Sequence, residues 1–315
     1  MSAHLFAGVA RAISLLEENE LVQRFIVAEP LVCCHGEAAA AMKTSMRLRG
    51  PITSVAKFRT QRLLLTQMIY RDVVGRYQGS MLGVLWSLLT PLLMLGVYTL
   101  VFGTVFKARW SEEGSTTPEF AILLFAGLIV YGLFSEVVSR APSLVLVNAS
   151  YVKKVVFPLE ILPLVTLGSA LFHAAVSFSV LIGSILVING QIPATALALP
   201  IVLGPFVLML TGLGWFLASL GIYLRDISQF LGSLTTALMF LSPVFYPASA
   251  LPQGVRAYLF LNPVALPIEQ VRDALIWGKM PDLTELAAYT LVAIVVAAAG
   301  FAWFQKTRGG FADVL

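Results

Sequence analysis

Charged residues are scarce in this sequence. Asp, Glu, Lys and Arg together make up 12% of its 315 residues, whereas 58% are hydrophobic. Soluble domains carry about a quarter of charged residues, so this composition excludes an ordinary water-soluble protein. The net charge of +4 is better explained by basic residues that flank membrane spans than by binding to nucleic acid. The composition predicts an all-α polytopic membrane protein with no nucleic-acid partner.

Residues that bind metals or activate nucleophiles are also rare. The chain has two cysteines, in the sequence Cys33-Cys34-His35, and its other histidines are His4 and His173. Zinc needs about four ligands, and these residues have no matching spacing. The sequence G-x-x-x-x-G-K-[ST], which cradles ATP phosphates, is absent. We therefore expect no metal, no cofactor and no enzymatic activity, and the energy for any driven transport would come from another chain.

Ionisable residues within the apolar stretches are few. They are His173 and, near the end of a stretch, Glu136. An ion-coupled transporter or an intramembrane enzyme needs several polar groups that converge at depth, because charges there are costly. We interpret His173 as a hydrogen-bonded packing residue.

The longest charge-free stretch is Gly83–Phe106, with 24 residues. About 20 apolar residues cross a bilayer core of ~30 Å, so this stretch is long enough to span it. The preceding residues Ser54–Tyr70 have an apolar stripe opposite basic side chains. This pattern predicts an amphipathic helix at the membrane interface, and a solvated soluble helix is the alternative.

Five more stretches are long enough, or nearly so, to cross. The six predicted spans are residues 83–106, 120–138, 161–188, 199–222, 229–246 and 283–304. Six spans place both termini on one side of the membrane. That side then holds sixteen of the 21 Lys and Arg residues, and the opposite loops hold five. Because basic loops favour the inner side, both termini are predicted to be cytoplasmic.

Residues 1–50 differ from the rest. They contain an acidic run and both cysteines but no stretch long enough for a span. We expect a loosely ordered extension, with residues 51–315 forming the transmembrane domain. Met42 and Met46 precede basic sequence, so either residue is an alternative start.

The predicted inner loop 139–160 contains apolar residues at helical spacing between Pro142 and Pro158. This pattern predicts a short amphipathic helix across the cytoplasmic face, where exposed aromatic and basic residues favour a protein partner. A simple connector is the alternative.

The outer stretch 247–282 is apolar but is cut by prolines into pieces of roughly 10–14 residues, too short to cross. We expect two short helices that re-enter the membrane from outside, broken at Asn262-Pro263. A cap that packs on the outer surface is the alternative.

Aromatic residues are abundant in the predicted spans. Sugar rings stack on aromatic faces, so these residues are candidates to line a path for a glycan, although the same stripes are typical of helix packing. The candidates are Trp86, Tyr98, Phe102, Phe106, Tyr131, Phe134, Phe240, Phe245 and Tyr246.

Four motifs in register resemble one family. They are IYRDVVGRYQGSMLGVLWSLLTPLL, VKKVVFPLEILP, YLRDIS and LNPVALPIEQVRDALIWG, and the likeness covers roughly residues 54–308. Together they resemble the permease subunit of ABC-2 transporters that export polysaccharides such as O-antigen, teichoic acid and capsule.

The resemblance implies a homodimer of permeases with two ABC-type ATPase subunits. Such a complex would export a lipid-linked glycan across the cytoplasmic (inner) membrane, through a channel between the permeases. Residues 54–70 would be a gate helix, 144–156 the coupling helix to the ATPase, and 252–261 and 264–277 two outer gate helices. The implied coupling residues are Leu144, Val147, Tyr151, Val152, Lys153 and Lys154. The implied outer-gate residues are Arg256, Tyr258, Asn262, Pro263, Glu269 and Arg272.

Other functions remain as alternatives. An ABC-2 permease for drugs or lipids would share the architecture, but the stretch LGVLWSLLTPLL favours the polysaccharide branch. A polytopic enzyme of lipid-linked sugar transfer would need charged residues that handle metal and phosphate, and those of the inner loops are sparse. A passive scaffold is the third alternative.

Overall fold

A computed structural model describes most of the chain. The described residues are 51–105, 117–154, 157–250, 252, 254, 259 and 262–314. By its internal contacts the chain divides into two units, Met1–Arg62 and Leu63–Leu315. The first contributes the described residues 51–62, which begin helix α4, and the second contains the other described elements. Residues 1–50 lie outside the described residues, so the N-terminal extension stays a prediction.

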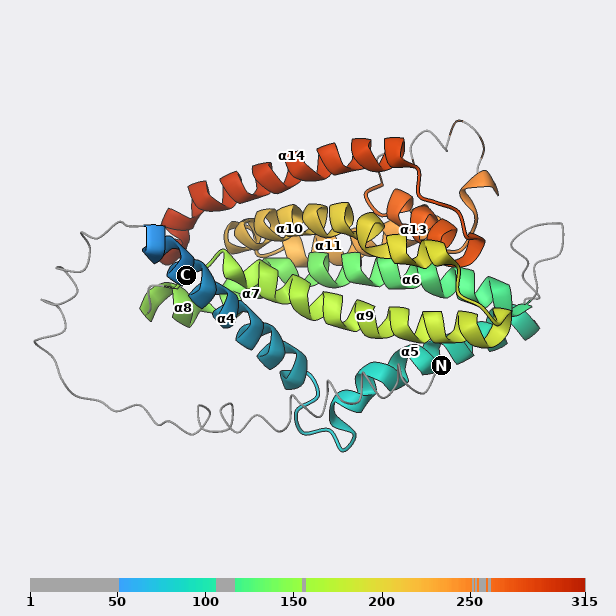
Figure 1. The fold of residues 1–315 in the computed structure, drawn as a ribbon. Coiled ribbons are helices and arrows are strands. Elements are labelled where there is room, and N and C mark those ends of the chain that lie inside the picture. Colours follow the sequence, from blue (N-terminus) through green and yellow to red (C-terminus); the bar gives the residue numbers. More distant parts are fainter. Residues whose placement is uncertain are drawn as a thin grey trace, which may run out of the picture. The chain divides into compact units, whose positions relative to one another are not determined.

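Every regular element among the described residues is helical, as predicted (Figure 1). The α-helices are α4 (Pro51–Gly75), α5 (Trp86–Tyr98), α6 (Thr117–Arg140), α7 (Leu144–Val147), α8 (Ala149–Lys154), α9 (Ile161–Asn189), α10 (Leu199–Tyr223), α11 (Ile227–Leu241), α13 (Ala265–Arg272), α14 (Leu283–Thr307) and α15 (Phe311–Val314). The 3-10 helices are η2 (Gly83–Leu85), η4 (Ala141–Ser143), η5 (Ala194–Ala198), η6 (Ala248–Ala250) and η9 (Arg308–Gly310). The π-helices are η3 (Thr99–Val105) and η8 (Asp273–Trp277).

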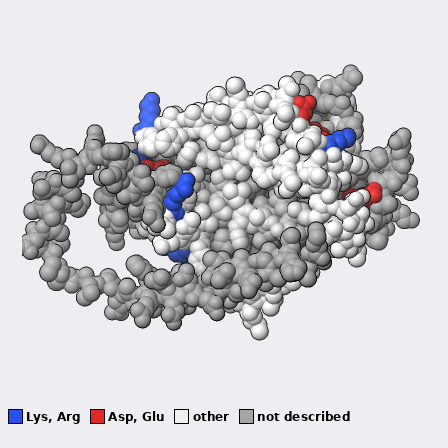
Figure 2. All heavy atoms as spheres, in the orientation of Figure 1, with Lys and Arg blue, Asp and Glu red and all other residues white. Residues whose placement is uncertain are grey.

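Five helical stretches among the described residues are long and apolar enough to cross a membrane. They are Gly83–Phe102, Glu119–Val147, Ile161–Asn189, Ala194–Tyr223 and Leu283–Gly310. They correspond to the first four and the sixth of the predicted spans. On the face shown in Figure 2, the visible charged side chains lie toward the two ends of the molecule, with an uncharged region between them. This distribution is that of a bundle whose middle lies in lipid.

The fifth predicted span, residues 229–246, is wrong in its length. Helix α11 has 15 residues and ends at Leu241. At 1.5 Å per residue it is about 22 Å long, short of the ~30 Å core. The helix ends because Ser242 precedes Pro243, and the residue before a proline is driven out of the helical region. Ser242 has extended backbone angles, with φ −87° and ψ 150°.

Helix α6 forms the centre of the bundle in residues 63–315. In its apolar stretch 78% of the residues are buried, compared with 6% in the stretch that contains α5. Helices α5, α9, α10, α11 and α13 all contact α6. A helix that is apolar on every face is expected to be enclosed by others, which explains the position of α6. Helix α5 lies at the edge of the bundle.

Helices α10 and α14 approach each other closely through small residues. A Cβ atom on Gly212 would lie 2.6 Å from the Cα of Ala297, and one on Gly300 would lie 2.1 Å from the carbonyl oxygen of Gly212. Packing between membrane helices relies on such small residues, because lipid gives apolar side chains little reason to associate. The glycines therefore fix the α10–α14 pair.

We expect Gly212→Ala to destabilise the folded chain by about 1–3 kcal/mol, the usual cost of overpacking a tight contact. Gly204→Ala, on the same helix, is the matched control because no atom lies within 4 Å of its added Cβ. Thermal unfolding in detergent measures both variants. Equal melting temperatures for the two would contradict the importance of this contact.

Candidate functional site

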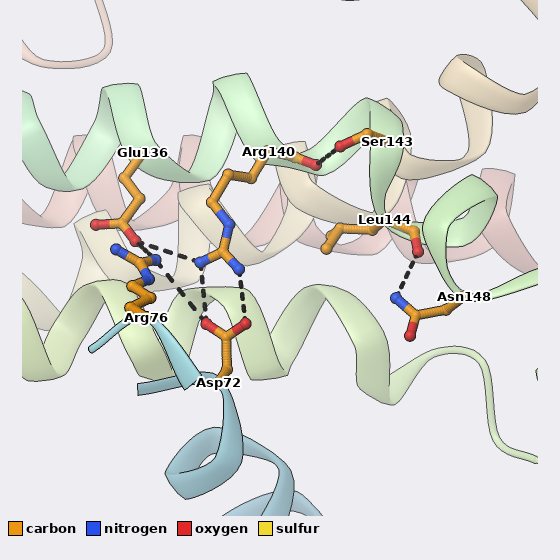
Figure 3. Close-up of polar contacts among 7 residues, drawn as sticks. All are labelled: Asp72, Arg76, Glu136, Arg140, Ser143, Leu144 and Asn148. Atoms are coloured by element: carbon orange, nitrogen blue, oxygen red, sulfur yellow. Dashed lines mark hydrogen bonds and ion pairs between the residues drawn. The ribbon is translucent and has the colours of Figure 1, made fainter. Parts of the chain in front are cut away.

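Four charged side chains form a closed ring between α4 and α6 (Figure 3). The guanidinium of Arg140 binds both carboxylate oxygens of Asp72, at 2.7 and 3.0 Å. Arg140 also lies 3.4 Å from the Glu136 carboxylate, which in turn accepts a hydrogen bond from Arg76. Arg76 lies 3.9 Å from Asp72 and closes the ring. We name these four residues the charge ring.

The charge ring is electrically neutral and partly shielded from water. Its side chains are between 20 and 32% exposed. Burial of Asp72 would raise the pKa of its carboxyl, but the hydrogen bonds and positive charge of Arg140 outweigh this effect and hold the pKa below its usual range. The contribution of Asp72 to stability is therefore present at neutral pH and is lost only when the pH falls through this lowered pKa.

Helix α9 supplies polar groups beside the charge ring. The Tyr77 hydroxyl lies 3.3 Å from Nδ1 of His173, and the two rings pack edge to face at 5.9 Å. The side chain of Ile69 fits over Gly168, where a Cβ would come within 2.3 Å of it. His173 is thus a packing residue that hydrogen-bonds to Tyr77, just after α4, in keeping with its sequence interpretation.

The predicted coupling segment forms two short helices instead of one. Helix α7 ends at Val147, and α8 begins at Ala149. Asn148 lies between them with non-helical angles (φ −104°, ψ 28°), and its side chain donates to the carbonyl of Leu144 at 2.8 Å (Figure 3). An asparagine that binds nearby backbone competes with helix formation, which explains the interruption.

Side chains of the coupling segment point in different directions. Leu144 is half-buried, whereas Val147 is 79% exposed. Tyr151 is half-buried: its ring stacks on Phe157 at 4.8 Å and its hydroxyl accepts from Arg71 at 3.1 Å. These contacts help to hold the segment in place, and the coupling role of Tyr151 stays a prediction. The side chains of Val152, Lys153 and Lys154 lie outside the described residues.

A small second core lies under the coupling segment. It unites α7 with the neighbouring ends of α9, α10, α14 and α15. Its buried members are Val145, Leu159, Leu162, Ala218, Ile222, Phe304 and Phe311. We call this end of the bundle the α8 end, and the opposite end, which carries α13, the α13 end.

Arg272 is the central residue of the α13 end. It is 3% exposed, and its guanidinium donates to the carbonyls of Leu123, Pro243 and Val244. The space comes from Gly127 on α6, where a Cβ would lie 2.6 Å from an Arg272 nitrogen. A single cation thereby joins α13 to α6 and to the turn after α11.

Other side chains hold the segment around α13. Asn262 is buried; it donates to the Ser242 hydroxyl at 2.8 Å and accepts from the Val264 amide at 3.1 Å. The hydroxyl of Tyr289 donates to the Pro263 carbonyl at 2.7 Å. Pro263 and Glu269 are half-buried. Of the predicted gate residues, Arg256 and Tyr258 lie outside the described residues, so their roles stay predictions.

The aromatic candidates separate into two groups. Tyr131 and Phe134 are 5% and 3% exposed in the core of a single chain, and the Tyr131 hydroxyl donates to the Thr235 carbonyl. They pack α6 against its neighbours, so we no longer regard them as channel-lining candidates. Phe106 lies outside the described residues. Partly or fully exposed are Trp86, Tyr98, Phe102, Phe240, Phe245 and Tyr246.

Sequence reasoning missed the charge ring. The signal was present, because Asp72 and Arg76 are four residues apart, as are Glu136 and Arg140, and each pair therefore lies on one helical face. The sequence did not indicate that these two faces meet. Within the described part of the chain, no group of three His, Cys, Asp or Glu residues is placed to hold a metal ion.

Comparisons with known proteins identify relatives over most of the chain. The family model for ABC-2 type transporters matches residues 64–276. The O-antigen export system permease protein RfbA of Myxococcus xanthus is 28% identical over 253 residues, which cover 79% of this chain and 94% of that protein. The protein of the same name from Klebsiella pneumoniae is 24% identical, with 80% and 95% covered. The polysialic acid transport protein KpsM of Escherichia coli is 24% identical, with 77% and 93% covered.

We expect Arg272→Met to destabilise the α13 end, because it leaves the carbonyls of Pro243 and Val244 without their donor and each buried unsatisfied group costs about 1–3 kcal/mol. Arg225→Met is the control, since Arg225 is exposed. Folded yield and melting temperature in detergent compare the variants. A stable, monodisperse Arg272→Met protein would contradict the assigned role.

Proposed function

The chain belongs to the ABC-2 type transporter family, and we propose that it is the permease subunit of a transporter that exports lipid-linked polysaccharide across the cytoplasmic membrane. The observation that carries this proposal is that the chain aligns with nearly the full length of its relatives. Two proteins named for O-antigen export and one named for polysialic acid transport each align over more than nine-tenths of their length. No observation in this chain favours a drug or lipid substrate over a glycan.

The energy source in this proposal is a separate ABC-type ATPase subunit, present in two copies. The sequence has no G-x-x-x-x-G-K-[ST] loop to hold ATP phosphates. The coupling segment offers a docking point, because Val147 projects from a base that is fixed by the buried Val145. An exposed apolar side chain on a rigid support is typical of a protein contact.

A second copy of the permease completes the proposed conduit. Helix α11 buries little more than one stripe, at Leu231 and Thr235, and its other faces are largely exposed. These faces carry Gln229 and Ser233 together with Phe240, which is 61% exposed. Lipid cannot hydrogen-bond to such groups, so a water-filled path between two copies suits them. Aromatic rings along that path would stack on sugars.

The α8 end is cytoplasmic in this proposal, and the α13 end faces outward. The bias of Lys and Arg along the sequence supports this orientation, with both termini inside. Helix α13, with eight residues, is too short to span, and its buried neighbours suit a segment that enters the membrane from outside. Because Arg272 ties α13 to α6, we propose that α13 is a fixed base for the outer gate.

We expect Val147→Glu to abolish binding of the ATPase subunit, because it places a charge in the centre of the proposed contact. Val187→Glu is the control: Val187 is 84% exposed near the end of α9, at the opposite end of the bundle. Co-purification with the ATPase subunit measures binding, and ATP hydrolysis by the purified samples measures activity.

In this experiment the wild-type permease alone should not hydrolyse ATP, and the complex should. Intact binding by Val147→Glu would show that the ATPase docks elsewhere. Sustained hydrolysis by the permease alone, after removal of contaminants, would refute the permease proposal itself.

The orientation can be tested with single cysteines in a chain that lacks Cys33 and Cys34. We expect a membrane-impermeant thiol reagent outside intact cells to label Met280→Cys and to leave Ser150→Cys unlabelled. Both side chains are exposed, Met280 after α13 and Ser150 on α8, so each should react from its own side. The reverse pattern would invert the proposed topology.

A further inference from the structure

The coupling segment is a continuous extension of α6. Helix α6 ends at Arg140 and passes through η4 directly into α7. The turn is seated against α10, because a Cβ on Gly221 would lie 2.1 Å from the carbonyl oxygen of Pro142. The Ser143 hydroxyl also donates to the Arg140 carbonyl at 3.0 Å (Figure 3). A displacement of α7 therefore also displaces the end of α6 that carries Glu136 and Arg140.

Two contacts would pass a displacement of α6 and α7 on to the end of α4. The charge ring joins Asp72 and Arg76 to α6, and Arg71 donates to the Tyr151 hydroxyl of α8 at 3.1 Å. The Asp72–Arg140 contact is bidentate, which adds strength and fixes the relative orientation of the two groups. The residues from 71 to 76, which end α4 and begin the turn after it, are thus linked both to the end of α6 and to α8.

The chain after α4 is open. The residues from Gln78 to Leu82 are exposed, and Gly79 has a positive φ of 84° in a turn with no atom within 4 Å of an added Cβ. This turn leads through η2 into α5, the span at the edge of the bundle. The part of α4 from residue 63 to 75 is therefore held by contacts with α6, α8 and α9, and the turn that follows connects it to α5.

We propose that the charge ring is the linkage through which ATPase-driven movement of the coupling segment reaches α4 and, through α4, the first span. Asp72, Arg76, Glu136 and Arg140 are positioning residues in this scheme, which rests on the proposed function. An ionic linkage suits this place because the ring is neutral as a whole and partly hydrated. It can therefore move as a unit without burying an unpaired charge.

The test follows the turn between α4 and α5 with a fluorescent label. Met81 is fully exposed in this turn, so an environment-sensitive dye is attached to Met81→Cys in a chain without Cys33 and Cys34. The complex with its ATPase subunit is reconstituted in lipid, and the signal is compared before and after addition of ATP and vanadate. The single variants are Asp72→Arg and Arg140→Asp. The rescue variant exchanges all four charges: Asp72→Arg, Arg76→Asp, Glu136→Arg and Arg140→Asp.

We expect each single variant to bind the ATPase subunit normally and to reduce the ATP-dependent signal by about tenfold, the effect of about 1.4 kcal/mol. The fourfold exchange should restore the signal, because only the exchange of all four charges keeps opposite charges next to each other around the ring. If a charge reversal prevents folding, Asp72→Asn and Glu136→Gln remove single charges at similar shape and should weaken the signal.

Arg308→Gln is the matched control. It removes another ion pair at the α8 end, with Glu160 at 3.2 Å, that does not involve α4. A full signal in every folded charge-ring variant, or an equal loss in Arg308→Gln, would overturn the linkage. A wild-type chain that binds no ATPase subunit would instead refute the proposed function, so the two failures are distinct.

Discussion

The need to satisfy backbone polar groups away from water governs this structure. A helix satisfies its own amides and carbonyls, which is why every regular element among the described residues is helical. Each place where a helix breaks leaves carbonyls that need another donor. Arg272 supplies donors to the carbonyls of Pro243 and Val244, and Tyr289 supplies one to Pro263. The Trp215 indole donates to the Glu160 carbonyl, just before α9 begins, at 3.0 Å.

These hydrogen bonds hold the chain in place where its helices are interrupted. Because the guanidinium of Arg272 also reaches Leu123 on α6, the break after α11 cannot open without the loss of hydrogen bonds on two helices. The α13 end is therefore stiff. At the α8 end a buried apolar core holds α7, whereas the charge ring that joins α6 to the end of α4 is partly exposed, and such contacts can exchange with water at lower cost.

The sequence predicted those features that depend on local pattern. Apolar length located five of six spans, and Asn262-Pro263 marked a real break before α13. The end of α11 at Leu241 could also have been predicted, because Pro243 follows it. The span was nevertheless extended to residue 246, because residues 242–246 are largely apolar. The interruption at Asn148 depended on a side-chain hydrogen bond that periodicity does not reveal.

Long-range pairings could not be predicted from one sequence. Tyr131 and Phe134 were predicted to line a channel, but both lie on α6, which its neighbours bury. All the spans have a similar apolar composition, so composition alone does not indicate which of them lies at the centre. The charge ring likewise could not be predicted, because it forms only where α4 packs against α6 with Asp72 next to Arg140.

The contrast between tight and open helix faces indicates where a second copy would bind. Helices α10 and α14 meet through Gly212 and Gly300, with no room for even a methyl group, so that pair is closed within one chain. Helices α5 and α11 leave most of their surface uncovered, and α11 adds hydroxyl and amide groups that lipid cannot satisfy. In the proposed function, a path between two copies would cover this surface of α11 with a partner chain and water.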